Sequence, residues 1–144
     1  MFKRILIPID GSEAAWHALS HARVLGEKFA SFITIIHVIE PHYALPAVAI
    51  SGEPPFINLS IEEVETTGYK LLEMARQRME GYGELEATLE FGHPAERIIA
   101  LAKEEDYDLI VMGSRGLSAI AGFFQGSTSS AVAHYSTVPV LLVK

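Results

Sequence analysis

The sequence predicts an α/β fold, a doubly wound, open parallel sheet with helices on both faces. Short apolar runs rich in β-branched residues alternate with longer amphipathic stretches. The apolar runs are nearly continuous, as in parallel strands that are covered on both faces. The alternation reads β-α-β-α-β-α-β-α-β, which is typical of an α/β domain of the Rossmann-like type.

Five segments are predicted to be strands. The first ends at Asp10-Gly11, a turn signal, and the third alternates between apolar and polar residues and is the weakest of the set. In chain order the strands are 3–9, 32–39, 85–91, 108–112 and 138–143.

Three segments have the apolar spacing of one helix face, and a shorter fourth helix is predicted after them. Ser60 and Glu63 have the spacing of a capping box before the second helix. Pro94 opens the third helix, since proline is well placed at a first helical position. The other three helices are 13–29, 61–80 and 127–135.

Length and composition describe a single domain, 1–144. The chain has no cysteine, which excludes disulfides and thiolate metal sites. A net charge of −7 argues against a broad nucleic-acid surface, which needs clustered Lys and Arg. The apolar runs are shorter than the roughly 20 residues of a membrane span, and no leader precedes the first strand. We therefore expect a cytoplasmic protein.

The segment 40–59 matches neither a helix nor a strand pattern. It contains four prolines, and loops of this length are uncommon without a function or disorder. Its apolar stretch ALPAVAI disfavours disorder. A lid or partner-contacting segment and a surface loop packed on its own domain both remain open.

The stretch 113–130, GSRGLSAIAGFFQGSTSS, follows the fourth predicted strand. In open α/β sheets, ligands bind beyond the carboxyl ends of the strands, where the strand order reverses. If the order is 3-2-1-4-5, the first and fourth strands flank that point. The topology then brings Asp10 close to this stretch.

The residue types in this region suit a nucleotide. Glycine at 113 and 116 allows positive φ and close approach to a bulky anion. Arg115 can donate charge-assisted hydrogen bonds to phosphate. Asp10 suits a ribose hydroxyl, as the acidic residue does in dinucleotide sites.

The start of the fourth helix adds an anion-binding feature. Gly126 and the hydroxyl run 127–129 open this helix, whose free N–H groups and dipole favour negative charge. Taken singly, Asp10-Gly11-Ser12 is better explained as a turn and helix cap, and Gly116 as a turn. Their joint occurrence at one sheet edge is what predicts a nucleotide site.

The chain resembles the universal stress proteins, specifically their nucleotide-binding branch, over nearly its whole length. The resemblance runs from KRILIPIDGSE through HVIE, FGHPAERII and DLIVMGSRG to GSTSSAVAHYSTVPVLLV. The family signature G-x2-G-x9-G-[ST] is met by Gly113, Gly116, Gly126 and Ser127.

This resemblance implies a five-stranded sheet of order 3-2-1-4-5, homodimers, and ATP as the ligand, with Mg²⁺ or Mn²⁺ held through its phosphates. It implies that Pro8, Asp10 and the backbone around Val38 line the adenosine. It assigns the ribose and phosphates to Gly113, Arg115, Gly116, Gly126, Ser127, Thr128 and Ser129.

The sequence argues against rapid ATP hydrolysis. A P-loop requires G-x4-G-K-[ST], and the stretch from Gly122 to Ser127 has neither the spacing nor the lysine. We expect an ATP-binding stress-response protein, a nucleotide-dependent dimeric switch with at most slow hydrolysis. A slow ATPase or nucleotidyl-transfer enzyme using the same site, and a nucleotide-free dimeric interaction protein, are the alternatives.

The last predicted strand, 138–143, indicates how a dimer forms. In the order 3-2-1-4-5 it lies at a sheet edge, yet it carries no charge before Lys144. Exposed apolar edges invite pairing, so a second copy across a two-fold axis is the favoured cover. A helix or loop of the same chain is the alternative.

His17 and His21 stand four positions apart on the first helix, a spacing that metals can use. No third ligand is recognisable beside them. A solvated helix face is favoured over a metal site.

Overall fold

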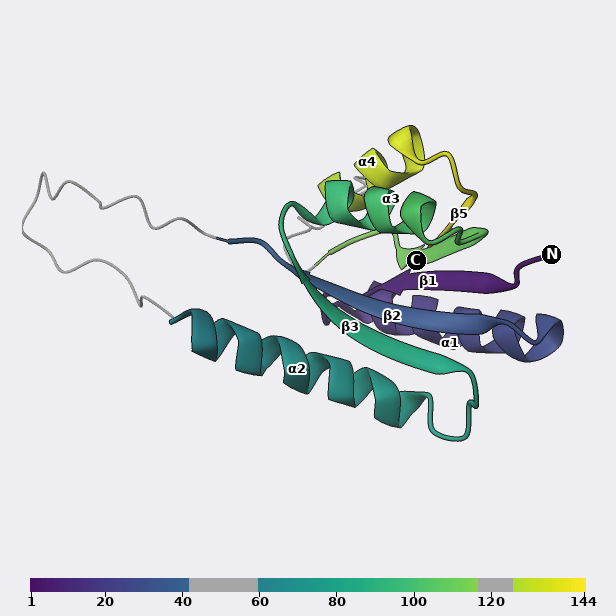
Figure 1. Ribbon diagram of the computed structural model, residues 1–144, viewed down its shortest axis with the longest axis horizontal. Helices are drawn as coiled ribbons and strands as arrows, with labels where there is room; N and C mark the ends of the chain where they lie inside the picture. Colours follow the sequence, from purple (N-terminus) through teal and green to yellow (C-terminus); the bar gives the residue numbers. More distant parts are fainter. Residues whose placement is uncertain (42–59, 117–125) are drawn as a thin grey trace, which may run out of the picture.

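The computed structural model describes residues 1–41, 60–116 and 126–144. In these residues strands and helices alternate along the chain (Figure 1). The strands are β1 (Arg4–Pro8), β2 (Phe32–Ile39), β3 (Leu85–Phe91), β4 (Leu109–Gly113) and β5 (Val140–Val143). The helices are α1 (Glu13–Phe29), α2 (Ile61–Arg78), α3 (Pro94–Glu104) and α4 (Ser127–Tyr135).

The five strands form one parallel sheet of order β3-β2-β1-β4-β5. The predicted fold class and strand order are therefore confirmed. The prediction for 40–59 falls almost entirely on residues outside the described ranges, as does the middle of the glycine-rich stretch, 117–125. None of the helices within the described ranges is long and apolar enough to cross a membrane.

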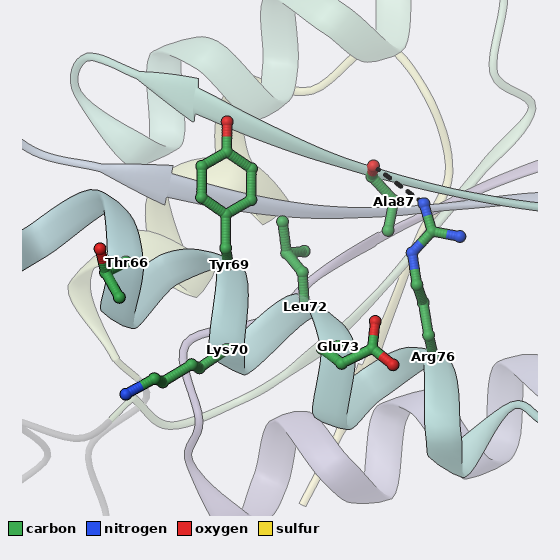
Figure 2. A pocket seen from close by; sticks show the side chains of 7 residues that line it. All are labelled: Thr66, Tyr69, Lys70, Leu72, Glu73, Arg76 and Ala87. Atoms are coloured by element: carbon green, nitrogen blue, oxygen red, sulfur yellow. Dashed lines mark hydrogen bonds between the residues drawn. The ribbon is translucent and has the colours of Figure 1, made fainter. Parts of the chain in front are cut away.

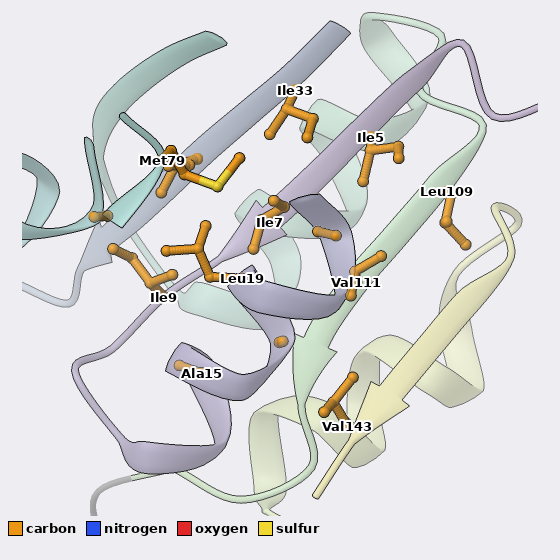
Figure 3. Packing of buried hydrophobic residues seen from close by; sticks show 14 of the residues in the cluster. Ile5, Ile7, Ile9, Ala15, Leu19, Ile33, Met79, Leu109, Val111 and Val143 are labelled. Carbon is orange, nitrogen blue, oxygen red and sulfur yellow. The ribbon is translucent and has the colours of Figure 1, made fainter. Parts of the chain in front are cut away.

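The sheet separates two apolar cores, because α1 and α2 lie on one face and α3 and α4 on the other (Figure 1). Successive residues of β1 alternate between them: Ile5 and Ile7 join the core under α1 and α2, and Leu6 joins the other. Figure 3 shows the first core, with Leu19 of α1 packed over the sheet. Burial on both faces explains why the central strands read as unbroken apolar runs.

Local side-chain caps fix where two helices begin. The Ser12 hydroxyl accepts the Ala15 N–H at 3.2 Å and so begins α1. The capping box predicted for α2 is present, with the Ser60 N–H 2.7 Å from Glu63 Oε2 and the Glu63 N–H 3.2 Å from Ser60 Oγ. Both helices therefore start at the residues that the sequence predicts.

The last strand is shorter than predicted, since β5 begins at Val140 instead of residue 138. The Ser136 hydroxyl accepts the Val138 N–H and donates to the Val138 carbonyl. Val138 is thereby held in a local turn, and Pro139 has no N–H to add to a ladder.

The end of β4 lies directly against the first turn of α1. A Cβ at Gly113 would lie 2.7 Å from the Ala14 carbonyl carbon and 2.8 Å from the Ala15 nitrogen. Only a residue without a side chain allows this approach. The contact places the amino end of α1 beside the carboxyl end of β4.

We expect Gly113→Ala to lower the free energy of unfolding by about 1–3 kcal/mol, because the new methyl group meets backbone that cannot easily move. Gly83→Ala is the control, since a Cβ there has nothing within 4 Å, and it should change stability by less than about 0.5 kcal/mol. Denaturant unfolding followed by circular dichroism measures both. Equal stability of the two variants would contradict the close contact.

Candidate functional site

The carboxyl end of β1 separates from β4, its neighbour on one side. The two strands are paired only at Ile5 and Leu6 among the described residues. Alternate residues of a strand direct their backbone groups to the same neighbour, and the Arg4 carbonyl accepts the Asp108 N–H on this side. Pro8, the buried last residue of β1, also faces β4 and has no N–H to donate. Its position in the sheet therefore ends the pairing with β4.

The same end of β1 then separates from β2. The Ile9 N–H still donates to the Ile36 carbonyl at 2.8 Å. In a regular ladder the Val38 N–H would next donate to the Ile9 carbonyl, and within the described residues this bond is not formed. Nδ1 of His37 lies 2.8 Å from that carbonyl oxygen instead. The backbone of the half-buried Val38 is thus directed toward the region beyond the end of β1, where β1 is paired with neither neighbour and which is here called the gap.

A tight turn follows, with the Asp10 carboxylate at its centre. Asp10 Oδ1 accepts the Ser12 N–H at 2.9 Å. Asp10 Oδ2 lies 2.8 Å from the position that a Cβ on Gly116 would occupy. The Ser12 hydroxyl, 3.2 Å from the Arg115 carbonyl oxygen, joins the two segments. The predicted proximity of Asp10 to the glycine-rich stretch is confirmed, although more than 100 positions separate them.

Hydrogen bonds to Ser114 hold the beginning of α4 against the end of β4. Its carbonyl oxygen accepts the Gly126 N–H at 2.8 Å and the Ser129 hydroxyl at 2.9 Å. Its own N–H donates to the Val143 carbonyl at 2.8 Å. Ser114 and Gly126 therefore meet at one point of the sheet edge.

The first N–H groups of α4 have no hydrogen-bond acceptor among the described residues. Gly126 is the N-cap and offers no capping side chain, and the first turn contains no acidic residue. The Ser130 N–H is the first to reach back, to the Gly126 carbonyl at 2.9 Å. By helix geometry the N–H groups of residues 127–129 have no acceptor within the helix. Together with the helix dipole, they suit an anion.

The three hydroxyl residues at this helix end differ in their surroundings. Ser129 is 3% exposed, and its hydroxyl lies within hydrogen-bond distance of the Ser114 and Gly126 carbonyls. Ser129 therefore has a structural role, because its hydroxyl is already hydrogen-bonded within the protein. Ser127 is exposed and Thr128 half-buried. Their hydroxyls form no hydrogen bond within the described ranges.

One predicted reason for the glycines is wrong. Positive φ was expected at 113 and 116, and neither residue has it. Gly113 is required by its contact with the α1 backbone, and a Cβ at Gly116 would force the Asp10 carboxylate beside it to move. Steric proximity in the folded protein, not an unusual backbone angle, selects glycine at both positions.

Sequence reasoning missed Ser12, Ser114 and His37 as parts of this site. Ser12 stands in a recognisable position, directly after Asp-Gly and before a helix. Ser114 contributes through its backbone N–H and carbonyl, and the residue type does not reveal such a role. The His37 contact requires knowing where β1 leaves the sheet. Arg115, which was predicted, is exposed, and its guanidinium forms no ion pair with any described residue.

A separate groove of about 530 Å³ lies between α2 and the edge strand β3. Figure 2 shows Tyr69 and Arg76 rising from α2 toward β3, where Arg76 Nη2 lies 3.5 Å from the Ala87 carbonyl oxygen. None of the residues predicted to bind nucleotide lines it. It is distinct from the site at the end of β1.

His17 and His21 are exposed on α1, as predicted. His17 Nδ1 lies 3.0 Å from the Lys144 carbonyl oxygen, and His21 Nδ1 lies 2.8 Å from the His17 carbonyl oxygen. In the part of the chain that the structure describes, three or more potential metal ligands do not gather anywhere.

The fold and the site define a doubly wound α/β protein with an acidic residue and an uncapped helix end at the point where strand order reverses. The sequence profile of the Universal stress protein family matches residues 1–144, and the chain belongs to this family.

Individual relatives agree with this assignment. Universal stress protein YxiE of Bacillus subtilis (strain 168) is 35% identical over 149 residues, covering all of both chains. Universal stress protein MJ0577 of Methanocaldococcus jannaschii is 33% identical over 160 residues, covering all of this chain and 96% of the relative. A solved universal stress protein in complex with cAMP superposes with a TM-score of 0.73 at 25% identity, covering 99% of this chain and 96% of the other.

We expect Ser129→Ala to lower the free energy of unfolding by about 0.5–1.5 kcal/mol, because it removes the buried donor at the start of α4. Ser127→Ala is the matched control, since its hydroxyl is exposed, and should leave stability within about 0.5 kcal/mol. Thermal and denaturant unfolding compare the two variants. A Ser127 variant as destabilised as the Ser129 variant would contradict the scaffold role of Ser129.

Proposed function

We propose that this protein is an ATP-binding regulatory protein of the stress response, acting as a nucleotide-dependent dimeric switch. ATP, with Mg²⁺ or Mn²⁺ held through its phosphates, occupies the carboxyl edge of the sheet. The observation that carries the proposal is the meeting of the Asp10 carboxylate, Gly116 and the uncapped start of α4 at one point. A sugar acceptor and an anion site thereby lie side by side.

In this proposal the adenosine lies in the gap around the end of β1. Pro8 supplies an apolar wall, and the backbone of Val38 supplies the polar edge that recognises the base. The Asp10 carboxylate accepts hydrogen bonds from the ribose hydroxyls. The relative solved with cAMP supports an adenine nucleotide as the ligand class.

The phosphates then extend toward α4. Gly113 and Gly116 leave room along the end of β4, and Gly126 adds no side chain at the helix end. The N–H groups of residues 127–129 and the hydroxyls of Ser127 and Thr128 donate to phosphate oxygens. The exposed Arg115 can swing in as a charged donor.

The same residues explain why we propose at most slow hydrolysis. Rapid phosphoryl transfer needs a positioned cation, a metal-holding acid and a group that orients water. Here a lysine at the P-loop position is missing from the sequence. Asp10, the acid of the site, is engaged by the Ser12 N–H and assigned to the ribose. The arrangement supports binding more than turnover.

Mass spectrometry of small molecules released from the purified protein should detect an adenine nucleotide. After its removal, ATP with Mg²⁺ at about 100 times its Kd should stabilise the protein by about 2.7 kcal/mol, or roughly 5–10 °C in Tm. Asp10→Ala should reduce this shift, while Glu86→Ala, an exposed acid on β3, should retain it. The absence of any shift at millimolar ATP would overturn the proposal.

The dimer is proposed to form through residues 138–143, which contain the last strand, β5. β5 lies at the sheet edge, as predicted. Its Leu141 is 38% exposed and carries no charge. A second copy on this edge would cover Leu141 and continue the sheet's hydrogen bonding across a two-fold axis.

Leu141→Lys is expected to convert the dimer into a monomer, because it places a charge at the centre of the proposed interface. Val24→Lys is the control: Val24 is 64% exposed on α1, and the same change there should leave the dimer intact. Light scattering at micromolar protein, with and without ATP, measures the mass and its dependence on nucleotide. A monomeric wild-type protein in both conditions would contradict the switch.

A further inference from the structure

The imidazole of His37 lies where the ladder between β1 and β2 stops. Its Nδ1 is 2.8 Å from the Ile9 carbonyl oxygen. That oxygen can only accept, so Nδ1 carries the hydrogen, in the neutral ring and in the imidazolium alike. The ring thus takes the acceptor that the Val38 N–H would use if the ladder continued by one more bond.

This substitution of a side-chain donor for a backbone donor has two consequences for the gap. The Ile9 carbonyl is satisfied, so the chain can leave β2 without a buried unpaired acceptor. The Val38 N–H is left without that acceptor and stays directed toward the gap. A hydrogen bond from the Val38 N–H to the Ile9 carbonyl would bring the two strands together. The Val38 N–H would then no longer be available to the base.

Helix α2 holds the ring in place. A Cβ at Gly68 would lie 3.3 Å from His37 Cδ2 and 2.8 Å from a methyl carbon of Leu89. Glycine at 68 therefore provides the space that the imidazole and its neighbours occupy. Three residues further along α2, Leu71 Cδ1 lies 3.3 Å from the position of a Cβ on Gly11. The same helix thus supports the ring and the turn that carries Asp10.

We propose that His37 is a positioning residue that keeps the Val38 backbone and the Asp10 turn apart at the width of an adenine base. It acts through the Ile9 carbonyl and contacts no nucleotide itself. Base selectivity, not only affinity, therefore depends on its Nδ1–H. This inference rests on the proposed function.

The test compares two substitutions in nucleotide-free protein. His37→Leu removes the donor, and His37→Asn restores one, because the Asn amide places an N–H close to the position of Nδ1. Titration calorimetry measures the Kd for ATP and for inosine triphosphate, which differ at the edge of the base. His21→Leu, on the exposed face of α1, is the control.

His37→Leu should weaken ATP binding by about tenfold, the upper range for one hydrogen bond, and reduce the preference for ATP over inosine triphosphate. His37→Asn should restore affinity and preference to within about threefold, and the control should match wild type. Equal weakening of both nucleotides with an unchanged ratio, as a general loss of stability would cause, would overturn the inference.

Nuclear magnetic resonance of the nucleotide-free protein gives a second, independent readout. The imidazole spectrum of wild type should show the hydrogen on Nδ1. The Val38 amide should exchange quickly in wild type and become protected in His37→Leu, as the ladder closes onto Ile9. A hydrogen on Nε2 and none on Nδ1, with binding intact, would overturn the role of His37 alone. Wild-type protein that binds no adenine nucleotide would instead overturn the proposed function, and with it any positioning role.

Discussion

The site depends on one constraint: the central strand β1 loses both of its neighbours within two residues. Up to Ile7 the strand is paired and buried on both faces, which fixes it rigidly in the sheet. Pro8 cannot donate to β4, and beyond Ile9 the ladder to β2 is not continued. Leaving a ladder exposes backbone groups that need partners. The Asp10 carboxylate accepts the Ser12 N–H, and the His37 imidazole donates to the Ile9 carbonyl. The backbone that borders the gap is therefore held by side-chain hydrogen bonds.

The amino ends of two helices lie beside this gap, and they differ in how they are capped. The start of α1 is already capped, because the Ser12 hydroxyl accepts the Ala15 N–H. The start of α4 has Gly126 as its N-cap, without a side-chain acceptor. A cap is worth about 1 kcal/mol to a helix, so leaving it out is costly unless another acceptor takes its place. Serine at one end gives the start of α1 a structural cap, and glycine at the other fits the anion-binding role that we propose for α4.

Much of this arrangement could be predicted from the sequence, because the signals are local. Apolar patterning located the strands and the first three helices of the described ranges, and the capping box located the start of α2. Topology then brought Asp10 to Gly116 without any knowledge of side-chain positions. The errors arose where contacts between distant segments or an irregular turn determine the structure. The glycines at 113 and 116 lie against a helix and a carboxylate that are far away in sequence. The start of β5 depends on a turn at Ser136. The ring of His37 has no sequence signal, since its partner is a backbone group freed by the fold.

In the proposed complex with ATP, the two halves of the site are held by different kinds of interaction. The phosphate side is fixed by hydrogen bonds to the backbone of Ser114, one of them from the buried Ser129 hydroxyl. The adenosine side is fixed by packing against α2, where Gly68 and Leu71 have neighbours at contact distance or closer. Packed interiors respond to a change of a single methyl group. Substitutions in the buried face of α2 should therefore affect the binding of the base and sugar more than the binding of the phosphates. In the proposed complex, α2 is the element that couples the packing of the rest of the protein to the nucleotide.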